Sequence, residues 1–178
     1  IASGIVSVFS VPGRFEKIDS GMGFGVGVDY AHTEDALRLL LKAAAEFVER
    51  KIITLFGCGG DRDRGKRPLM GKAAIELSDY VIVTSDNPRT ENPQRIMDEI
   101  EAGVREAMRT PARRASGYKL ILDRGTAIEE AVQMAKKGDL VVVAGKGHEC
   151  YQIIGNKKLH FDDREEVKKA IVQRKGKC

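Results

Sequence analysis

The sequence predicts an α/β fold with a mostly parallel β-sheet and helices on both faces. Between about residue 23 and residue 139, short apolar runs alternate with helical patterns, as in a doubly wound sheet. Several of these runs are apolar almost throughout, which is typical of parallel strands buried on both faces. The chain has 178 residues, of which 42% are hydrophobic and 31% charged, and this matches one globular domain.

Five segments are expected to form the strands of this sheet. They are 24–30, 52–58, 80–86, 119–123 and 139–145. Beyond the fifth, segment 151–161 has Gly155 and Asn156 between two short β-prone runs, which predicts a C-terminal hairpin or an antiparallel edge strand. A last helix is expected from about Asp162.

Capping signals predict where other helices begin. Thr33 precedes an acidic first turn, Asn92 is followed by Pro93, and Thr126 stands three residues before Glu129. The helix expected near 34–49 has an apolar stripe that we predict to face the sheet. The stripe consists of Leu37, Leu40, Leu41, Ala44, Phe47 and Val48.

Composition argues against several classes of protein. No run reaches the roughly 18 uncharged apolar residues of a spanning helix, and the first residues lack the features of a secretory signal, so we expect a cytoplasmic protein without membrane contact. The three cysteines show no CxxC spacing and share no ligand rhythm with the three histidines, so we expect no metal site. A net charge of only +4 and the absence of Trp argue against nucleic acid as a partner.

Three charged loops are predicted to meet at one rim of the sheet, because ligands bind beyond the carboxyl ends of parallel strands. The loops are 57–71, 86–93 and 145–149. Their charged residues are Arg62, Arg64, Lys66, Arg67, Arg89, Lys146 and Glu149. The convergence of three such loops indicates a binding site more strongly than any single motif.

The first loop resembles a phosphate-binding loop, but the match fails at one position. Gly60, Gly65 and Lys66 fit the GxxxxGK[ST] pattern, whereas Arg67 stands where the magnesium-binding hydroxyl belongs. Two interpretations remain, a solvated charged turn and a loop that presents Arg62 to an anionic ligand. We favour the second.

The other two loops carry groups suited to an amino acid. Asp86, Asn87 and Pro88 form a turn that aims Arg89, whose planar guanidinium holds both oxygens of a carboxylate. The alternative is that Arg89 pairs with Asp86 or Glu91 on the surface. In the third loop, Gly145 allows close backbone approach and Glu149 accepts hydrogen bonds from an ammonium group. Together these groups predict a pocket for a zwitterion.

A further cluster lies nearer the N-terminus, in segments 13–16 and 28–33. Asp29 is suited to ribose hydroxyls, and Arg14 or His32 to phosphate. For His32, capping or packing of a helix is an equal alternative. Spacing alone does not assign these three residues.

Read in order, VPGRFE, VDYAHT, FGCGGDRDRGKRPLMG, TSDNPRTENP and GKGHE closely resemble the C-terminal part of the Mur ligases, in the branch that adds diaminopimelate. The resemblance spans nearly the whole chain. It implies a Rossmann-like C-terminal domain at 23–178 that brings the incoming amino acid. Residues 1–22, which fit the alternation poorly, are then expected to be a linker and the remnant of a preceding ATPase domain.

The resemblance also implies roles for single residues. The positions that correspond to diaminopimelate ligands are Arg62, Asp86, Asn87, Arg89, Gly145 and Glu149. Those that correspond to ATP-binding positions are Arg14, Asp29 and His32. No catalytic residue and no metal ligand are implied within this chain.

The family couples ATP, with Mg²⁺ held mainly by a central domain, to formation of an acyl phosphate on UDP-MurNAc-L-Ala-D-Glu, which meso-diaminopimelate then attacks. This chain lacks the phosphate loop and the UDP-binding domain, so we expect it to be inactive alone. The alternatives are a non-catalytic module that binds an amino acid or a nucleotide, and the related folate polyglutamate ligase, which is not expected to combine DNPR with GKGHE.

Overall fold

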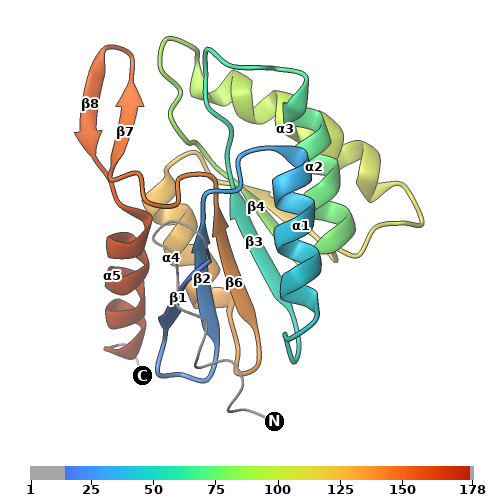
Figure 1. Cartoon of the computed structure of the whole chain (residues 1–178), viewed down its shortest axis with the longest axis vertical. Coiled ribbons are helices and arrows are strands. Elements are labelled where there is room, and N and C mark those ends of the chain that lie inside the picture. The colour runs from blue at the N-terminus through green and yellow to red at the C-terminus, as the bar shows by residue number, and fades with distance from the viewer. Residues whose placement is uncertain (1–14, 177–178) are drawn as a thin grey trace.

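The computed structural model describes residues 15–176, in which a six-stranded sheet carries helices on both faces (Figure 1). The strands of this sheet are β1 (Glu16–Asp19), β2 (Gly25–Asp29), β3 (Ile52–Phe56), β4 (Tyr80–Val83), β5 (Tyr118–Leu120) and β6 (Leu140–Ala144). The helices are α1 (Glu34–Ala45), α2 (Lys66–Leu77), α3 (Pro93–Met108), α4 (Arg124–Met134) and α5 (Asp163–Lys175). A separate hairpin consists of β7 (Tyr151–Ile154) and β8 (Lys157–His160).

The sheet has the order β1-β2-β6-β3-β4-β5, and every neighbouring pair except β1 with β2 is parallel. All residues of β3 and β6 are buried, as expected for central strands covered on both faces. The prediction of a Rossmann-like, mostly parallel sheet is therefore confirmed.

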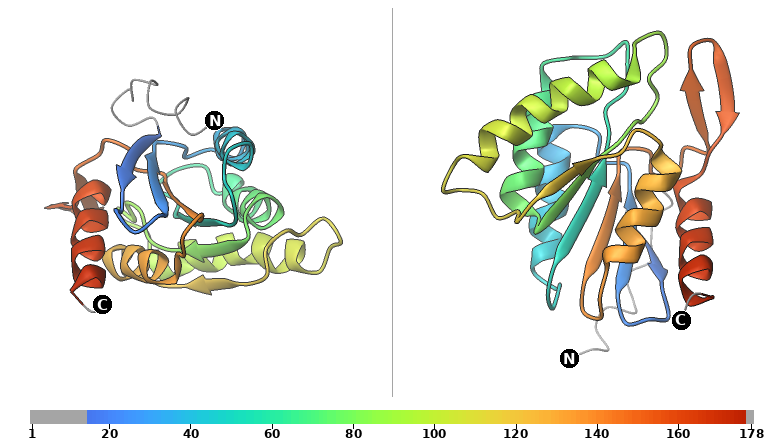
Figure 2. Two further views of the ribbon diagram at one scale, coloured as in Figure 1. Left: turned by 90° about the horizontal axis from the view of Figure 1, so that it is seen from below. Right: turned by 180° about the vertical axis from the view of Figure 1, so that it is seen from behind.

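Two apolar clusters form the core, one on each face of the sheet. Side chains of β3 contribute to both clusters. Ile52 and Phe56 pack in the cluster with α1, α2 and α3, whereas Ile53 and Leu55 pack in the cluster with α4 and α5. This division follows from the two-residue period of a strand. Figure 2 shows α4 and α5 on the side of the sheet opposite α1 and α2.

The helix starts at Thr33 and Asn92 are confirmed, since both side chains accept hydrogen bonds from first-turn amides. The start expected at Thr126 is wrong. Helix α4 begins at Arg124, and the Asp123 carboxylate accepts the Thr126 N–H at 2.7 Å. A carboxylate cap, strengthened by its charge, thus lies three residues before Thr126 and sets the helix start at Arg124.

The apolar stripe expected on the first helix is correct only in part. Helix α1 ends at Ala45, and Phe47 lies beyond it with 44% of its surface exposed. The Phe47 ring packs edge-on against Phe15, with 5.8 Å between ring centroids. The stripe fails there because the helical period no longer applies after Ala45.

The antiparallel elements differ from the expectation in one respect. Segment 151–161 does form a hairpin with its turn at Gly155 and Asn156, but it makes a sheet of its own and lies above the start of α5 in Figure 1. The antiparallel edge strand is β1, which pairs with β2. Because β1 lies within the segment expected to be a linker, the sheet begins before the boundary placed at residue 22.

Within residues 15–176, none of the helices is both long enough and apolar enough to cross a membrane.

Candidate functional site

A cavity of about 410 Å³ opens at the carboxyl ends of β2, β6, β3 and β4, four neighbouring strands of the sheet. All six residues predicted to bind an amino acid line it: Arg62, Asp86, Asn87, Arg89, Gly145 and Glu149. His32 lines it as well. The three charged loops therefore do converge on one rim, as the order of the parallel strands predicts.

The loops after β3 and β4 are held together through their backbones at Gly60. Its N–H donates to the Asn87 carbonyl oxygen at 2.8 Å. A Cβ at position 60 would lie 1.9 Å from the Pro88 carbonyl oxygen, so a residue with a side chain does not fit. The glycines of the first loop thus serve close packing of two loops.

Arg89 is aimed into the cavity by the β7–β8 hairpin as well as by the preceding proline. Its backbone has φ of 52°, in the left-handed region that a non-glycine residue rarely adopts. The hairpin fixes this conformation, because Arg89 N–H donates to the Ile153 carbonyl at 3.0 Å and Gly155 N–H donates to the Arg89 carbonyl at 2.7 Å. Sequence reasoning missed this contribution of the hairpin.

The two predicted arginines meet across Gly59. A Cβ at Gly59 would lie 2.8 Å from Arg89 Nη1 and 3.8 Å from Arg62 Cγ. Arg89 Nη1 also donates to the Gly60 carbonyl at 2.7 Å. Arg62 is exposed, and its Nη1 donates to the adjacent Asp61 carbonyl at 3.1 Å. Two arginines from different loops therefore line the same side of the cavity around Gly59, and guanidinium groups are the donors that suit a carboxylate.

Glu91, one of the two surface partners considered for Arg89, pairs with Arg67 instead. Fully buried, Arg67 donates to both Glu91 oxygens at 2.8 and 2.9 Å and to Glu99 at 2.7 Å. Hydrogen bonds from Arg67 lower the pKa of Glu91 to about 2. Glu91 is thus engaged by Arg67, and the residue that breaks the phosphate-loop pattern joins α2 to α3.

Lys66 is likewise engaged in holding loops together. Its Nζ donates to the His32 carbonyl at 2.7 Å, across from the loop that follows β2. This contact, together with the buried Arg67, gives the near-match to a phosphate loop a structural explanation.

Acidic groups line the cavity beside the arginines. Asn87 Nδ2 donates to Glu149 Oε2 at 2.9 Å, and Asp86 lies behind them with only 7% of its surface exposed. The charge of Glu149 raises the pKa of the Tyr151 hydroxyl, which also lines the cavity. Carboxylates next to guanidinium groups are the arrangement that a zwitterionic ligand requires.

A buried ion pair supports this rim from behind. Arg124 and Asp163 are almost wholly inaccessible and form two hydrogen bonds of 2.7 Å. The same guanidinium donates to the carbonyl oxygens of Ser85 at 3.2 Å and Ala144 at 3.0 Å. It thereby ties the ends of β4 and β6 to α5.

The three residues considered for nucleotide binding are placed differently from one another. Asp29 is not among the residues that line the cavity, and its two oxygens accept the Phe15 and Ala31 backbone N–H groups, each at 2.7 Å. His32 is exposed at the cavity, with its ring 4.6 Å from the Tyr30 ring. Arg14 lies outside the described residues.

Sequence reasoning did not assign several other residues that line the cavity. They include Tyr30, Cys58, Asp63 and Tyr151. Tyr151 stands two residues after Glu149 and Tyr30 directly after Asp29, so proximity to a predicted ligand was the available signal. Burial raises the pKa of the Cys58 thiol to about 12, which keeps this thiol protonated and unreactive.

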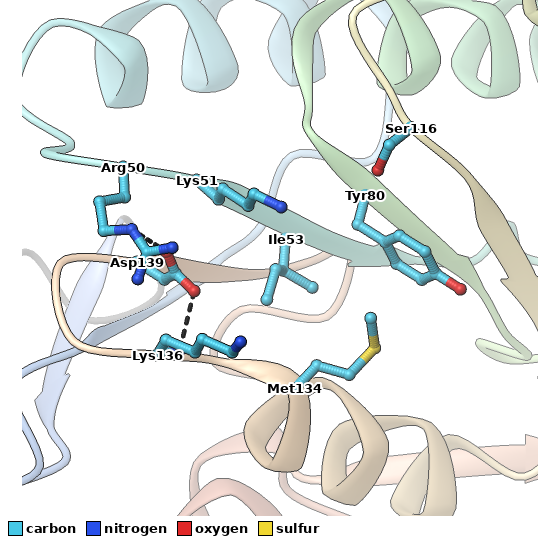
Figure 3. A pocket seen from close by; sticks show the side chains of 8 residues that line it. All are labelled: Arg50, Lys51, Ile53, Tyr80, Ser116, Met134, Lys136 and Asp139. Atoms are coloured by element: carbon cyan, nitrogen blue, oxygen red, sulfur yellow. Dashed lines mark hydrogen bonds and ion pairs between the residues drawn. The ribbon is translucent and has the colours of Figure 1, made fainter.

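A second cavity lies at the opposite edge of the sheet, near the amino ends of β3, β4 and β6 (Figure 3). Its volume is about 100 Å³, and it contains none of the residues predicted to bind a ligand. Asp139 accepts the Lys136 backbone N–H at 2.7 Å and lies 3.9 Å from Arg50 Nε. Among residues 15–176 no group of three or more His, Cys, Asp and Glu residues is placed to hold a metal ion.

The fold defines an α/β domain of the doubly wound class, with a candidate binding cavity at the carboxyl ends of its strands. Residues 13–147 match the family model described as "Mur ligase, glutamate ligase domain". The chain belongs to this family, as its motifs indicated.

Its relatives include enzymes named UDP-N-acetylmuramoyl-L-alanyl-D-glutamate–2,6-diaminopimelate ligase. The one from Gloeobacter violaceus is 51% identical and the alignment covers 99% of this chain and 35% of that protein. The one from Solibacter usitatus is 50% identical, with 96% and 33% covered. A solved structure of a ligase with the same name superposes with a TM-score of 0.83 at 43% identity, over 94% of this chain and 33% of that one. The chain thus spans about a third of the length of these relatives.

Proposed function

We propose that this chain is the amino-acid-adding domain of a ligase that joins meso-diaminopimelate to UDP-MurNAc-L-Ala-D-Glu in the synthesis of peptidoglycan precursors. The observation that carries the proposal is the convergence of Arg62, Arg89 and Glu149 on one cavity. The names of relatives about 50% identical support it. The cytoplasm, expected from the sequence because it shows neither a spanning run nor a secretory signal, is the proposed location.

The cavity is proposed to hold the end of diaminopimelate that does not react. Arg62 and Arg89 bind its carboxylate, and Glu149, next to Asn87 and Asp86, accepts hydrogen bonds from its ammonium group. The other amino group then faces away from the cavity, toward the rest of the ligase. The domain thus supplies orientation and selectivity.

The bond-forming step needs groups that this chain does not carry. ATP phosphorylates the D-glutamyl carboxylate and leaves as ADP, and the free amino group of diaminopimelate displaces phosphate from the acyl phosphate. When bound, Mg²⁺ would neutralise charge on the phosphates, and its ligands are proposed to come mainly from the central domain of the full-length protein. The chain alone is therefore proposed to be inactive.

Arg14, Asp29 and His32 are proposed to contact ATP when the domains close. Asp29 uses one hydrogen bond on each oxygen, and a carboxylate oxygen has a second lone pair, so it can still accept a ribose hydroxyl. His32 stands exposed at the cavity mouth, where phosphate can reach it.

Selectivity against L-lysine follows from Arg89. L-lysine has the distal ammonium group but no distal carboxylate, so its binding leaves the half-buried Arg89 with its carbonyl partner at Gly60 but without a counter-charge. An unpaired group of this kind costs about 1–3 kcal/mol, which corresponds to a preference of roughly 5- to 150-fold.

Steady-state kinetics of a full-length ligase that carries this domain test the proposal. Arg89→Ala is expected to raise KM for diaminopimelate at least tenfold and to leave KM for ATP within twofold, because Arg89 contacts only the amino acid. Arg50→Ala, at the second cavity, is the matched control and should change neither constant. Equal effects of Arg89→Ala on both constants would remove Arg89 from the amino-acid site.

Calorimetry on the 178-residue chain separates this proposal from a stand-alone binding module. Weak binding of diaminopimelate at best is expected, since other domains complete the site. Tight binding of L-lysine would contradict the substrate assignment. Tight binding of a free amino acid without any ligase activity of the full-length protein would favour the module.

A further inference from the structure

A fully buried lysine lies directly behind the acidic side of the cavity. Lys146 has no exposed surface, and its Nζ lies 3.2 Å from Asn87 Oδ1, 3.3 Å from Asp86 Oδ1 and 3.5 Å from Glu149 Oε2. An ammonium group has three N–H donors, and three acceptors surround this one. Lys146 therefore has no donor left for a ligand, and any role it has in binding acts through its neighbours.

One consequence of these contacts is the orientation of the Asn87 amide. Asn87 Oδ1 accepts from Lys146 Nζ and also from the Ile153 N–H at 2.9 Å. With its oxygen between two donors, the amide must turn its nitrogen toward Glu149 Oε2, at 2.9 Å. The orientation is thus determined by the hydrogen-bond network, and it places Glu149.

A second consequence concerns charge. The side chains of Asp86 and Glu149 are only 10% and 18% exposed, and two carboxylates this close repel each other in a medium of low dielectric constant. Lys146 neutralises one of them. The cavity lining contains the cations Arg62, Lys66 and Arg89 and the carboxylates Asp63, Asp86 and Glu149, so the buried Lys146 behind them leaves one more cation than carboxylates.

We propose that Lys146 is a positioning residue that makes the cavity selective for a zwitterionic end over a plain ammonium end. The inference rests on the proposed function and names the group that sets its selectivity. A zwitterionic end brings no net charge, whereas the distal end of L-lysine brings one positive charge into a site where Lys146 has already compensated one carboxylate. Without Lys146 the second carboxylate is free to accept that charge, and Asn87 and Glu149 lose their fixed orientation.

The test compares two substrates with a full-length ligase that carries this domain. In Lys146→Met, a variant of similar length without charge, the ratio of kcat/KM for meso-diaminopimelate to kcat/KM for L-lysine is expected to fall at least tenfold. KM for ATP should stay within twofold. A role confined to folding would lower both amino-acid activities together and leave their ratio unchanged.

A double variant separates charge from packing. Lys146→Met combined with Asp86→Asn removes one charge of each sign, and it is expected to restore at least a third of the lost selectivity on a logarithmic scale. Absence of any restoration would overturn the charge argument. Lys51→Met, at the second cavity, controls for loss of a positive charge, and Val132→Ala, on the buried face of α4, controls for loss of stability. Both should keep the wild-type ratio.

The outcomes are distinguishable from failure of the proposed function. A wild-type enzyme that does not use diaminopimelate would contradict the proposed function itself. A wild-type enzyme that uses it, together with an unchanged ratio in a folded Lys146→Met variant, would overturn only the role of Lys146. If the variants do not fold, nitrogen-15 NMR of the wild-type protein decides, because a buried ammonium with three partners should exchange its protons slowly and rapid exchange would contradict the arrangement.

Discussion

The two edges of the sheet both carry charge, but they handle it differently. At the carboxyl edge, Lys146, Arg67 and Arg124 are at most 1% exposed. At the amino edge, the side chain of Arg50 is 48% exposed, and Lys51 and Lys136 are exposed too. The cavity at the carboxyl edge has a volume of about 410 Å³, and the one at the amino edge about 100 Å³.

Burial of charge is costly unless partners compensate it, so its distribution is informative. Each cation buried at the carboxyl edge contacts a carboxylate and at least one oxygen from another loop. At the amino edge the cations are solvated, and the buried charge there is a single carboxylate, Asp139, with 5% of its surface exposed. The contrast teaches that the carboxyl edge is a framework of buried cations held by several loops, which suits preorganised binding, whereas the cations of the amino edge are compensated mostly by solvent.

The largest effect on stability is expected when the best-buried ion pair of the carboxyl edge, Arg124 with Asp163, is broken. Asp163→Asn leaves Arg124 buried without its counter-charge and is expected to lower the free energy of unfolding by about 3–5 kcal/mol. At the amino edge Asp139 is buried too, but its contact with the half-exposed Arg50 is long, at 3.9 Å, and an Asn oxygen can still accept the Lys136 N–H. Asp139→Asn should therefore change the free energy of unfolding by only about 1 kcal/mol. Urea unfolding of the 178-residue chain at neutral pH measures both.

Similar losses in the two variants would remove the distinction between the edges. A large loss in Asp139→Asn alone would reverse it, and would make the amino edge the structured one.

The next effect concerns backbone packing at the same two edges. Gly60→Ala forces a Cβ to within 1.9 Å of the Pro88 carbonyl oxygen, so the loops after β3 and β4 must separate, at a cost of about 2–3 kcal/mol. Gly138→Ala, at the amino edge, meets the flexible side chains of Arg50 and Glu49 and no backbone atom, and its φ of 86° costs about 1–2 kcal/mol. Thermal unfolding should rank Gly60→Ala below Gly138→Ala in stability, and the opposite ranking would show that the loops are not closely packed.

Sequence alone predicted the part of this framework that depends on local pattern. Near-continuous apolar runs identified β3 and β6, and the rule that parallel strands present their carboxyl ends together placed Arg62, Arg89 and Glu149 at one rim. Both inferences use only the local sequence pattern and the geometry of parallel strands. Neither requires knowing which side chains are in contact.

The remainder depended on contacts between distant residues. Strand β1 has four residues with one buried, too few for a pattern, and its pairing with β2 defines it. The partners of Lys146 and Arg124 lie up to 60 residues away along the chain, so nothing local distinguishes these buried cations from solvated ones. At Thr126, two capping signals competed, and the carboxylate of Asp123 prevailed.

The smallest expected effect is a dependence of stability on pH that arises from Glu91. Arg67 holds the pKa of Glu91 near 2, below its ordinary value of 4.5, so the folded state binds this proton less readily than the unfolded state. The stabilisation is therefore complete above about pH 4.5, declines as the pH falls and is lost below about pH 2. An ion pair with a partly exposed partner contributes about 1 kcal/mol.

Glu91→Gln removes the titrating group but keeps an oxygen that accepts a hydrogen bond from Arg67. Between pH 5 and pH 2, the free energy of unfolding of this variant should therefore fall less steeply than that of the wild type, with the two curves approaching each other at the acid end. Glu49→Gln, an exposed position near the amino edge, is the matched control and should follow the wild-type curve. Parallel curves for wild type and Glu91→Gln would mean that Arg67 does not hold Glu91 ionised, and that the joint between α2 and α3 rests on packing and not on charge.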